Sequence, residues 1–416
     1  MNQNHVIPIK PKGSNNSIVF FFLLILAFGA ALKDDLGAIS DDPFWSELSI
    51  HPLIALFKSY SYTLLAGAGV LSIYVAFTSK KLALRISGTA LAILALSGFA
   101  SLRASLIDQA AAVKLLQALV LYSLVILTSG LLMVRHSIET FKQEAARALF
   151  WFATIYIAIN VLNMVSGYGF VPGNSRFFGT TAHPNFIGIQ LAVCNIAIAA
   201  NVLLKPLRQW KTLATASPTL VVGVVAQLAT GSRTALVALV VGLAILLLVK
   251  RKFRIDPILI IFTILIFGFF SYLALSPDTA DGAFQRGTDG FSNTRAEAWS
   301  SMISLIIENP WFGNGYFIGF SENSYLRSMV AFGIPYGTAL TIILCWIFSL
   351  HFRNSKRTAT DLNSPNHVYF ALIGGLLAGG IFEGYLVDSW SLSKFILIFL
   401  SSTAILTPKK SPNSVT

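Results

Sequence analysis

The chain has 416 residues and a formal net charge of +12, and 55% of its residues are hydrophobic while only 12% are charged. Soluble domains carry about a quarter charged residues, so too little polar material is present to cover soluble domains of this length. The mean hydropathy of +0.70 agrees with this. The composition therefore excludes a soluble protein and predicts an integral membrane protein.

Apolar runs along the chain predict about twelve membrane-spanning helices, because runs of this length let a helix cross about 30 Å of hydrocarbon. In chain order they are residues 17–32, 60–79, 83–101, 115–134, 149–166, 186–204, 218–230, 234–249, 257–275, 327–350, 368–386 and 392–407. Lipid offers no water to satisfy an open backbone, so we expect helices throughout and an all-α fold. Run 218–230 is short, and it forms either a re-entrant hairpin or a span joined to the next by a tight turn; the loop charges favour the turn.

Lysine and arginine residues gather in alternate loops, and cytoplasmic loops are the ones that carry such an excess. The basic set is Lys10, Lys12, Lys80, Lys81, Arg135, Lys142, Arg147, Lys205, Arg208, Lys211, residues 250–254, Arg353, Lys356, Arg357, Lys409 and Lys410. The first loop on the opposite side is acidic, with Asp34, Asp35, Asp41, Asp42 and Glu47. We therefore expect both termini in the cytoplasm, and we attribute the net charge to this topology rather than to nucleic-acid binding.

The N-terminal run is as long as a span and lacks a clear cleavage site, so we expect it to be retained rather than removed as a signal peptide. Cys194 and Cys345 fall inside apolar runs and predict buried thiols, not a disulfide. No internal repeat is visible, whereas many secondary transporters carry one.

One outer loop is long, and it divides the chain into residues 1–275 with nine spans, the loop 276–326, and residues 327–416 with three spans and a tail. Within the loop, Thr294 and Glu297 have the spacing of a capping box. Trp299, Met302, Ile303 and Ile306 follow at helical spacing and form one apolar stripe. Residue 310 is a proline, which ends the helix. We predict a four-turn amphipathic helix along the outer membrane face.

Four arginines of the outer side run against the charge bias, so topology does not explain them: Arg176, Arg233, Arg295 and Arg327. Arginine at the membrane surface is costly without a partner. A phosphate or pyrophosphate would suit several of them, because guanidinium binds phosphate with two parallel hydrogen bonds. The alternative is that each arginine reaches lipid headgroups or pairs with a nearby aspartate.

Further polar groups lie at the same side of the predicted bundle. His183 and Asn185 flank Pro184 at the mouth of the sixth span, where they either cap the helix or serve a site. Glu383 is an ionisable residue near the outer end of the eleventh span, which makes it a functional candidate. We find no convincing Asp-x-Asp metal site in an outer loop, so no metal or cofactor is expected.

Four segments resemble motifs of one family. They are RFFGTTAHPN at 176–185, similar to a G-T-x-x-H/N-P-N loop; TGSRTA at 230–235, similar to an S-R-[GT]-A turn; 295–315, similar to an R-x-x-x-W…P-[LW]-F-G-x-G helix; and ENSYL at 322–326 with Gly333, similar to an H-N-x-[YF]-L…G entry. In this order among a dozen spans, they resemble the O-antigen ligase and Wzy-type polymerase superfamily. The resemblance covers residues 170–340 in motif and the rest of the chain only in topology.

The resemblance implies a GT-C-like, metal-independent glycosyltransferase of the bacterial inner membrane, with its active face in the periplasm. Its donor would be an oligosaccharide on undecaprenyl pyrophosphate. A polymerase passes the glycan to the next lipid-linked repeat unit, with a chain-length regulator protein as a further partner, and a ligase passes it to lipid A-core. The products would be O-antigen or another exopolysaccharide. Membrane lipids would surround the chain.

The resemblance also assigns roles to residues of this sequence. Arg233 and Arg295 would stabilise the pyrophosphate leaving group, while Arg176, Asn185, Asn323, Tyr325 and Arg327 would bind substrate. Glu383, which lies outside the four motifs, would either bind substrate with them or orient an arginine. The base that activates the acceptor hydroxyl is either Glu322 or His183; alternatively, Glu322 pairs with Arg327 or Arg295 and only builds the site. This chain has Glu322 where the family has histidine, and that departure favours a polymerase over a ligase. A lipid-linked oligosaccharide flippase remains the alternative of another class, although it would place charges in mid-span.

Overall fold

The computed structural model describes residues 17–33, 49–78, 83–171, 176–205, 210–252, 294–315, 323–387 and 390–406, and within these ranges the side chains of 210–212 and 294–296 are not described. Several sequence predictions fall outside these residues. They are the ninth span at 257–275, the acidic loop 34–47, Glu322, and the side chains of Thr294 and Arg295. The described part of the chain is helical, apart from one isolated β-bridge between Phe170 and Phe177.

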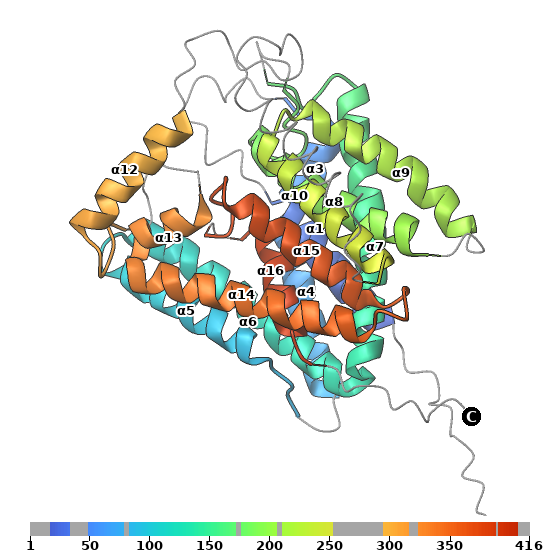
Figure 1. Ribbon diagram of the computed structural model, residues 1–416, viewed down its shortest axis with the longest axis horizontal. Helices are drawn as coiled ribbons and strands as arrows, with labels where there is room; N and C mark the ends of the chain where they lie inside the picture. The colour runs from blue at the N-terminus through green and yellow to red at the C-terminus, as the bar shows by residue number, and fades with distance from the viewer. Residues whose placement is uncertain are drawn as a thin grey trace, which may run out of the picture.

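The described residues contain fourteen helices (Figure 1). In chain order they are α1 (Ser17–Ala31), α3 (Pro52–Ser59), α4 (Ser61–Thr78), α5 (Gly88–Ser105), α6 (Gln109–His136), α7 (Ile138–Val165), α8 (Pro184–Leu204), α9 (Trp210–Ala229), α10 (Arg233–Lys250), α12 (Thr294–Glu308), α13 (Ser324–Phe332), α14 (Ile334–Arg357), α15 (Pro365–Gly380) and α16 (Leu392–Thr403).

Seven of these helices are long and apolar enough to cross a membrane, namely α4, α5, α6, α7, α8, α10 and α14. The shorter helices α1 and α16, together with residues 213–229 of α9, are apolar as well. The prediction of an all-helical, multi-pass membrane protein is therefore confirmed. The tight turn predicted between runs 218–230 and 234–249 is also present, since α9 ends at Ala229 and α10 begins at Arg233.

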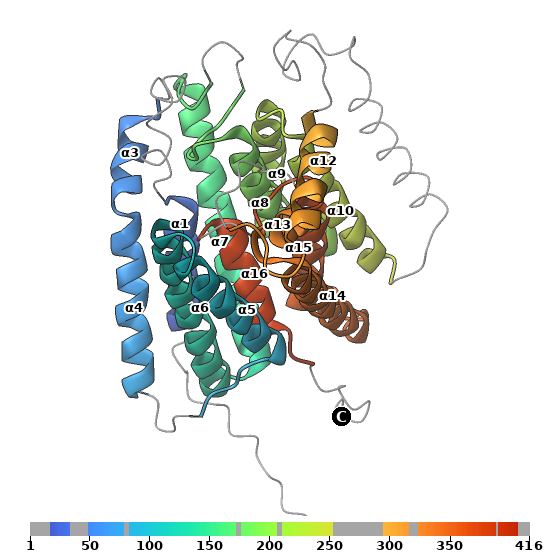
Figure 2. The same cartoon turned by 90° about the vertical axis from the view of Figure 1, so that its left-hand side faces the viewer.

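Helix α8 lies at the centre of the bundle, packed against α7, α9, α10 and α15. In its apolar window 83% of the residues are buried, against 22% in α4, which lies at one edge of the bundle (Figure 2). Close packing depends on glycine: a Cβ at Gly375 would lie 2.7 Å from the Ala238 carbonyl oxygen, and one at Gly188 would lie 2.8 Å from the Ser232 Cβ. Small residues let helices approach in this way inside membranes.

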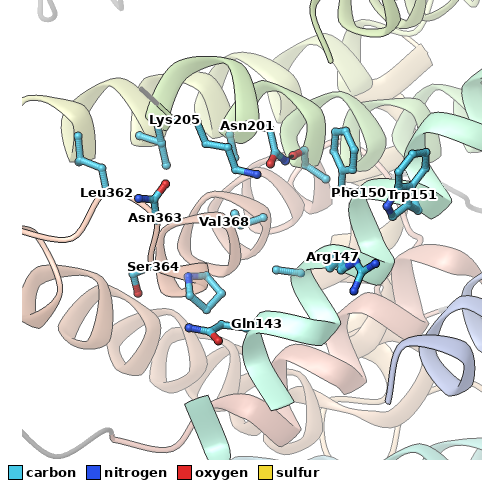
Figure 3. Close-up of a pocket in the computed structure, with 15 residues that line it drawn as sticks. Gln143, Arg147, Phe150, Trp151, Asn201, Lys205, Leu362, Asn363, Ser364 and Val368 are labelled. Atoms are coloured by element: carbon cyan, nitrogen blue, oxygen red, sulfur yellow. Dashed lines mark hydrogen bonds between the residues drawn. The ribbon is translucent and has the colours of Figure 1, made fainter. Parts of the chain in front are cut away.

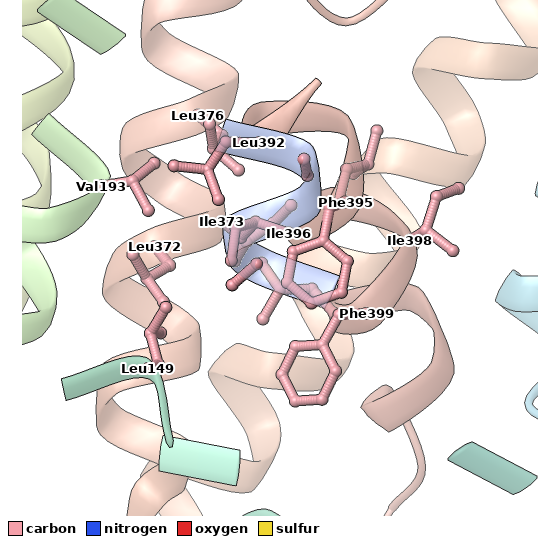
Figure 4. Packing of buried hydrophobic residues seen from close by; sticks show 14 of the residues in the cluster. Leu149, Val193, Leu372, Ile373, Leu376, Leu392, Phe395, Ile396, Ile398 and Phe399 are labelled. Atoms are coloured by element: carbon pink, nitrogen blue, oxygen red, sulfur yellow. The ribbon is translucent and has the colours of Figure 1, made fainter. Parts of the chain in front are cut away.

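Branched and aromatic side chains fill the interior between α15 and α16. Figure 4 shows Leu372, Ile373 and Leu376 of α15 beside Leu392, Phe395, Ile396 and Phe399 of α16. Leu149 of α7 and Val193 of α8 close this cluster. The packing fixes the C-terminal helices against the central one, and so it fixes the turns that join them.

The tenth span was predicted as one run over 327–350, and that prediction is wrong in detail. The helix breaks at Gly333, whose φ of 91° few other residues adopt, and α14 restarts at Ile334. The break is held by the turn after α12: the Ile334 N–H donates to the Pro310 carbonyl at 2.7 Å. A Cβ at residue 333 would lie 2.2 Å from the Trp311 carbonyl oxygen. The break therefore joins the surface helix to the span.

Replacing Gly333 with alanine should destabilise the protein, because the new Cβ meets Trp311 and L-residues avoid positive φ. We expect a loss of roughly 1–3 kcal/mol, measured as a lower Tm of the purified protein in detergent. The matched control is Gly98→Ala in α5, where an added Cβ finds nothing within 4 Å. Equal Tm values for the two variants would contradict this account of the break.

The amphipathic helix predicted in the long loop is present as α12, which ends at Glu308 before Pro310. Met302 and Ile306 are buried against Val330 of α13, and Trp299 packs beside them. Ile303 was placed on the same stripe but is 48% exposed, because the buried face of α12 is narrower than the sequence suggested. The helix therefore packs on α13 with one face and exposes an apolar side chain, Ile303, on another.

The eleventh span was predicted to run to residue 386, whereas α15 ends at Gly380. Residues 381–387 form turns instead. Glu383 therefore lies in a buried turn between α15 and α16 rather than in a helix, with 3% of its surface exposed.

Candidate functional site

The loop between α7 and α8 is held down by two buried amides of α7. The Asn160 Oδ1 accepts from the Thr180 N–H at 3.1 Å, and the Asn163 Nδ2 donates to the Gly179 carbonyl at 2.9 Å. Gly179 takes a positive φ of 58°, which the sharp turn requires. Both amides are fully buried, and buried polar groups paired in this way make a loop rigid.

Lys58 supports the same loop from a helix that the sequence analysis missed. This lysine lies on α3, is 2% exposed, and donates its Nζ to the Thr180 carbonyl at 2.6 Å. The Tyr156 hydroxyl bonds to the Thr180 Oγ1 at 2.8 Å and to Gln190. A lysine within the apolar segment PLIALFKS was the available signal, since a buried lysine is unfavourable unless its charge is used.

Arg176 joins this loop to the turn between α9 and α10. Its Nε donates to the Thr230 carbonyl at 3.0 Å, and its Nη2 donates to the Asn185 Oδ1 at 3.1 Å. The Phe177 N–H also donates to the Ala229 carbonyl at 2.9 Å. Arg233 starts α10 directly after this braced turn, with Ser232 as the N-cap whose Oγ accepts from the Ala235 N–H. The position of Arg233 is thus fixed by contacts from another loop.

Asn185 passes the connection on to Glu383. The Asn185 Nδ2 donates to the Glu383 Oε2 at 3.1 Å, so one amide lies between the Arg176 guanidinium and a buried carboxylate. A carboxylate at this depth is costly unless hydrogen bonds and charge partners satisfy it. Arg176, Asn185 and Glu383 therefore form one polar chain, partly buried at Arg176 and Asn185 and buried at Glu383, that crosses from the α7–α8 loop to the α15–α16 turn.

The α15–α16 turn is joined in turn to the start of α13. Ser324 donates both its N–H, at 3.1 Å, and its Oγ, at 2.6 Å, to the Glu383 carbonyl. Asn323 caps α13, with its Oδ1 accepting from the N–H groups of Tyr325 and Leu326. The Tyr325 hydroxyl donates to the Leu377 carbonyl at 3.1 Å. The helix that carries Arg327 is therefore anchored to the same cluster.

The surface helix reaches this turn through an aromatic contact. Trp299 of α12 stacks on Phe382, with ring centroids 6.5 Å apart and planes 29° apart. Phe382 immediately precedes Glu383, so the orientation of α12 is coupled to the buried carboxylate. The side chain of Arg295, one turn earlier on α12, lies outside the described residues.

His183 is the N-cap of α8, and its Nδ1 accepts from the Asn185 N–H at 3.1 Å. A neutral imidazole that accepts at Nδ1 carries its proton on Nε2. In this arrangement Nε2 can donate a hydrogen bond but cannot accept a proton. His183 is therefore arranged as a helix cap, and service as a base would require it to leave that role.

Lys394 is a further buried cation, which the charge pattern of the sequence did not single out. It lies on α16, is 8% exposed, and donates its Nζ to the Leu386 carbonyl. Its ammonium also sits 5.8 Å from the centre of the Tyr122 ring. Lys394 thus stabilises the turn at 381–387, in which Glu383 lies.

The structure brings together much of the predicted set, from parts of the chain far apart in sequence. Arg176, Asn185 and Glu383 form one hydrogen-bonded chain, Arg233 follows the turn that this chain braces, and Asn323 begins the helix bonded to the Glu383 turn. Because α8 begins here, we call this the site end of the bundle. The opposite end, where α8 finishes at Leu204, is called the basic end.

Comparison with known proteins identifies one family. Residues 218–338 match the family model described as O-antigen ligase, and no curated protein matches the chain. The match covers the second half of α9, the turn before Arg233, the helices α10, α12 and α13 and the start of α14, while the loop at 176–185 and Glu383 lie outside it. Members of this family are membrane transferases of lipid-linked glycans. This chain is therefore a multi-span membrane protein whose residues 218–338 match the O-antigen ligase family model.

Proposed function

We propose that the protein is a polymerase of lipid-linked oligosaccharide repeat units, acting at the periplasmic face of the bacterial inner membrane. The donor is an oligosaccharide on undecaprenyl pyrophosphate, and the acceptor is the next lipid-linked unit. The observation that carries the proposal is the hydrogen-bonded chain from Arg176 through Asn185 to the buried Glu383, together with the bond by which Arg176 holds the turn before Arg233. The match of residues 218–338 to the O-antigen ligase family model supports the class of substrate.

The arginines divide the work between them. Two nitrogens of Arg176 donate hydrogen bonds to the Thr230 carbonyl and the Asn185 side chain. Arg176 therefore acts as a positioning residue for the turn at 230–232. Arg233, the first residue of α10, is the group we assign to the departing pyrophosphate. The N-terminus of α10 adds its dipole, which favours an anion there. Arg295 and Arg327 are assigned to the same diphosphate and its lipid.

The reaction is a displacement at the anomeric carbon. The acceptor oxygen forms the new C–O bond from the face opposite the leaving group, and the bond between the anomeric carbon and the diphosphate oxygen breaks with its electron pair going to that oxygen. The anomeric configuration inverts, and the hydroxyl proton passes to a base. Fixed cations at the developing negative charge lower the barrier, because they need no reorganisation during the reaction. In this proposal the arginines take the part that a metal ion has in other transferases.

Glu322 is the base in this proposal. It precedes Asn323, whose side chain caps the helix bonded to the Glu383 turn. His183, the other candidate, already uses its Nδ1 as a helix cap. A carboxylate can take the proton of the acceptor hydroxyl as a general base.

Replacing Glu322 with glutamine should lower the rate of glycan lengthening by about 10²–10⁴-fold, the usual contribution of a general base. His183→Ala should cost less and act mainly by loosening the start of α8. The control is Glu308→Gln, a matched change at an exposed carboxylate of α12. Glycan length is measured in cells complemented with each variant at equal membrane levels. Full activity of Glu322→Gln with loss in His183→Ala would reverse the assignment.

A deletion strain separates the proposed polymerase from its alternatives. Loss of a polymerase leaves single repeat units on lipid A, which gel analysis of the glycans detects. Loss of a ligase instead leaves long chains on undecaprenyl lipid, and loss of a flippase traps unprocessed units on the cytoplasmic side. Only the first pattern agrees with the proposal.

A further inference from the structure

A cleft lies at the basic end of the bundle, far from the candidate site. Its volume is about 350 Å³, and its walls come from α7, α8 and the segment that leads into α15 (Figure 3). Helix α8 starts beside the candidate site and ends at this cleft, and its 21 residues separate the two by about 30 Å. The cleft is therefore a separate feature of the molecule.

The polar lining of the cleft is basic or neutral. Arg147 and Lys205 lie on opposite sides of it, with the Asn201 amide between them (Figure 3). None of its fifteen lining residues is acidic. Glu144, on the same helix, lies 3.6 Å from the Arg147 guanidinium, which also lies 5.3 Å from the centre of the Phe20 ring of α1. Arg147 remains 65% exposed, and a salt bridge this exposed is weak, so a phosphate can replace Glu144 as its partner.

Two further features favour an anion in the cleft. Ser364 and Pro365 line it at the N-terminus of α15, and the Ser364 Oγ accepts from the Asn366 side chain at 3.1 Å rather than from a backbone N–H of the first turn. The positive end of the α15 dipole is thus directed at the cleft. Burial lowers the pKa of Lys205, and a bound anion would offset the cost of keeping that ammonium charged. Lys205 also complements the carbonyl end of α8.

Apart from Gln143 and the loop residues 362 and 363, the remaining lining is apolar and comes from the helices α7, α8 and α15. Phe150 and Trp151 of α7 form its aromatic part, and Leu204 lies next to Lys205 at the end of α8. Trp151 is 41% exposed on the outside of the bundle, where acyl chains would lie. A ligand that matches the cleft therefore has a phosphate at one end and a hydrocarbon tail at the other.

We propose that this cleft binds the headgroup of an anionic glycerophospholipid, with its phosphate between Arg147 and Lys205 and its acyl chains along α7. Basic pockets between membrane helices bind such headgroups through the same combination of charge and apolar wall. The site is independent of the proposed catalytic function, because it lies at the other end of α8.

The test is native mass spectrometry of the purified full-length protein, titrated with dioleoyl phosphatidylglycerol and, separately, with dioleoyl phosphatidylcholine. The wild type should bind the first at least about tenfold more tightly. Arg147→Gln combined with Lys205→Gln should lose this preference. The control, Arg353→Gln with Lys356→Gln, removes two exposed cations at the end of α14 that do not line the cleft and should keep it.

A second variant guards against misfolding of the first. Asn363→Asp adds a carboxylate to an exposed loop residue at the mouth and should weaken phosphatidylglycerol binding while the Tm stays unchanged. The proposal is overturned if the two lipids bind equally well, or if the charge-removing double variant keeps the preference. Displacement of the lipid by millimolar inorganic phosphate would also overturn it, because the site would then select a free phosphate.

Discussion

Arg233→Ala should abolish long glycan chains while the protein remains folded in the membrane. The guanidinium stands at the start of α10, where the turn before it is braced by the hydrogen bond from Arg176 to the Thr230 carbonyl. Its proposed task is to stabilise charge that appears on the pyrophosphate as the glycosyl bond breaks. Removing one preorganised donor of this kind typically lowers the rate by about 10²–10³-fold. Arg233→Lys should recover only part of the rate, because an ammonium cannot bind phosphate with two parallel hydrogen bonds.

The comparison variant for Arg233 is Lys250→Ala, at the other end of the same helix and exposed. Both proteins should reach the membrane at equal levels, judged by immunoblot, and only the Arg233 variant should lose chain length on glycan gels. Normal chain lengths with Arg233→Ala would remove the pyrophosphate role from this residue.

Glu383→Gln should lower activity by at least about tenfold with little change in the fold. Glutamine has nearly the same shape, and its carbonyl oxygen can still accept the bond that the Asn185 amide now donates to the carboxylate. The variant loses the negative charge of Glu383, which the Asn185 amide links to the Arg176 guanidinium. Glu383→Ala should do more damage, because breaking a buried charged network costs about 3–5 kcal/mol.

The measurement for Glu383 combines Tm in detergent with glycan length in cells. Glu139→Gln, an exposed carboxylate in the first turn of α7, is the matched control and should leave both unchanged. If Glu383→Gln lowers the Tm as far as Glu383→Ala does, the residue supports the fold. If it instead keeps full activity, the charge is not needed.

Several helices and one turn could be predicted because they depend on local composition. Runs of apolar residues gave the positions of α1, α4 and α8, and the Gly-Ser-Arg turn marked the boundary between α9 and α10. The surface helix α12 followed from its capping spacing and apolar stripe. Such features need only a short stretch of sequence and the thickness of the bilayer.

The connections between loops could not be predicted, because they depend on which helices are neighbours. Nothing near Arg176 in the sequence shows that its guanidinium meets the Thr230 carbonyl, 54 residues later. The link from Asn185 to Glu383 spans 198 residues. Lys58 was missed for the same reason, since its partner carbonyl lies on a loop 122 residues away.

The break at Gly333 has a different origin. The chain around it is apolar enough to be one span, and the interruption comes from the turn at 310–315, which packs against the helix and bonds to its free backbone groups. The sequence pattern within the span does not predict that contact. The glycine alone indicated that the helix could break there, and the contact with Pro310 determines that it does.

Reconstitution of the purified protein in liposomes with an undecaprenyl-pyrophosphate-linked repeat unit tests the central claim most directly. The account predicts that lipid-linked oligosaccharides of two or more units appear together with free undecaprenyl pyrophosphate, one lipid released for each glycosidic bond formed, and that Arg233→Ala stops both. The contrary result is movement of the lipid-linked unit across the bilayer with no new glycosidic bond and no released pyrophosphate, which would make the protein a transporter.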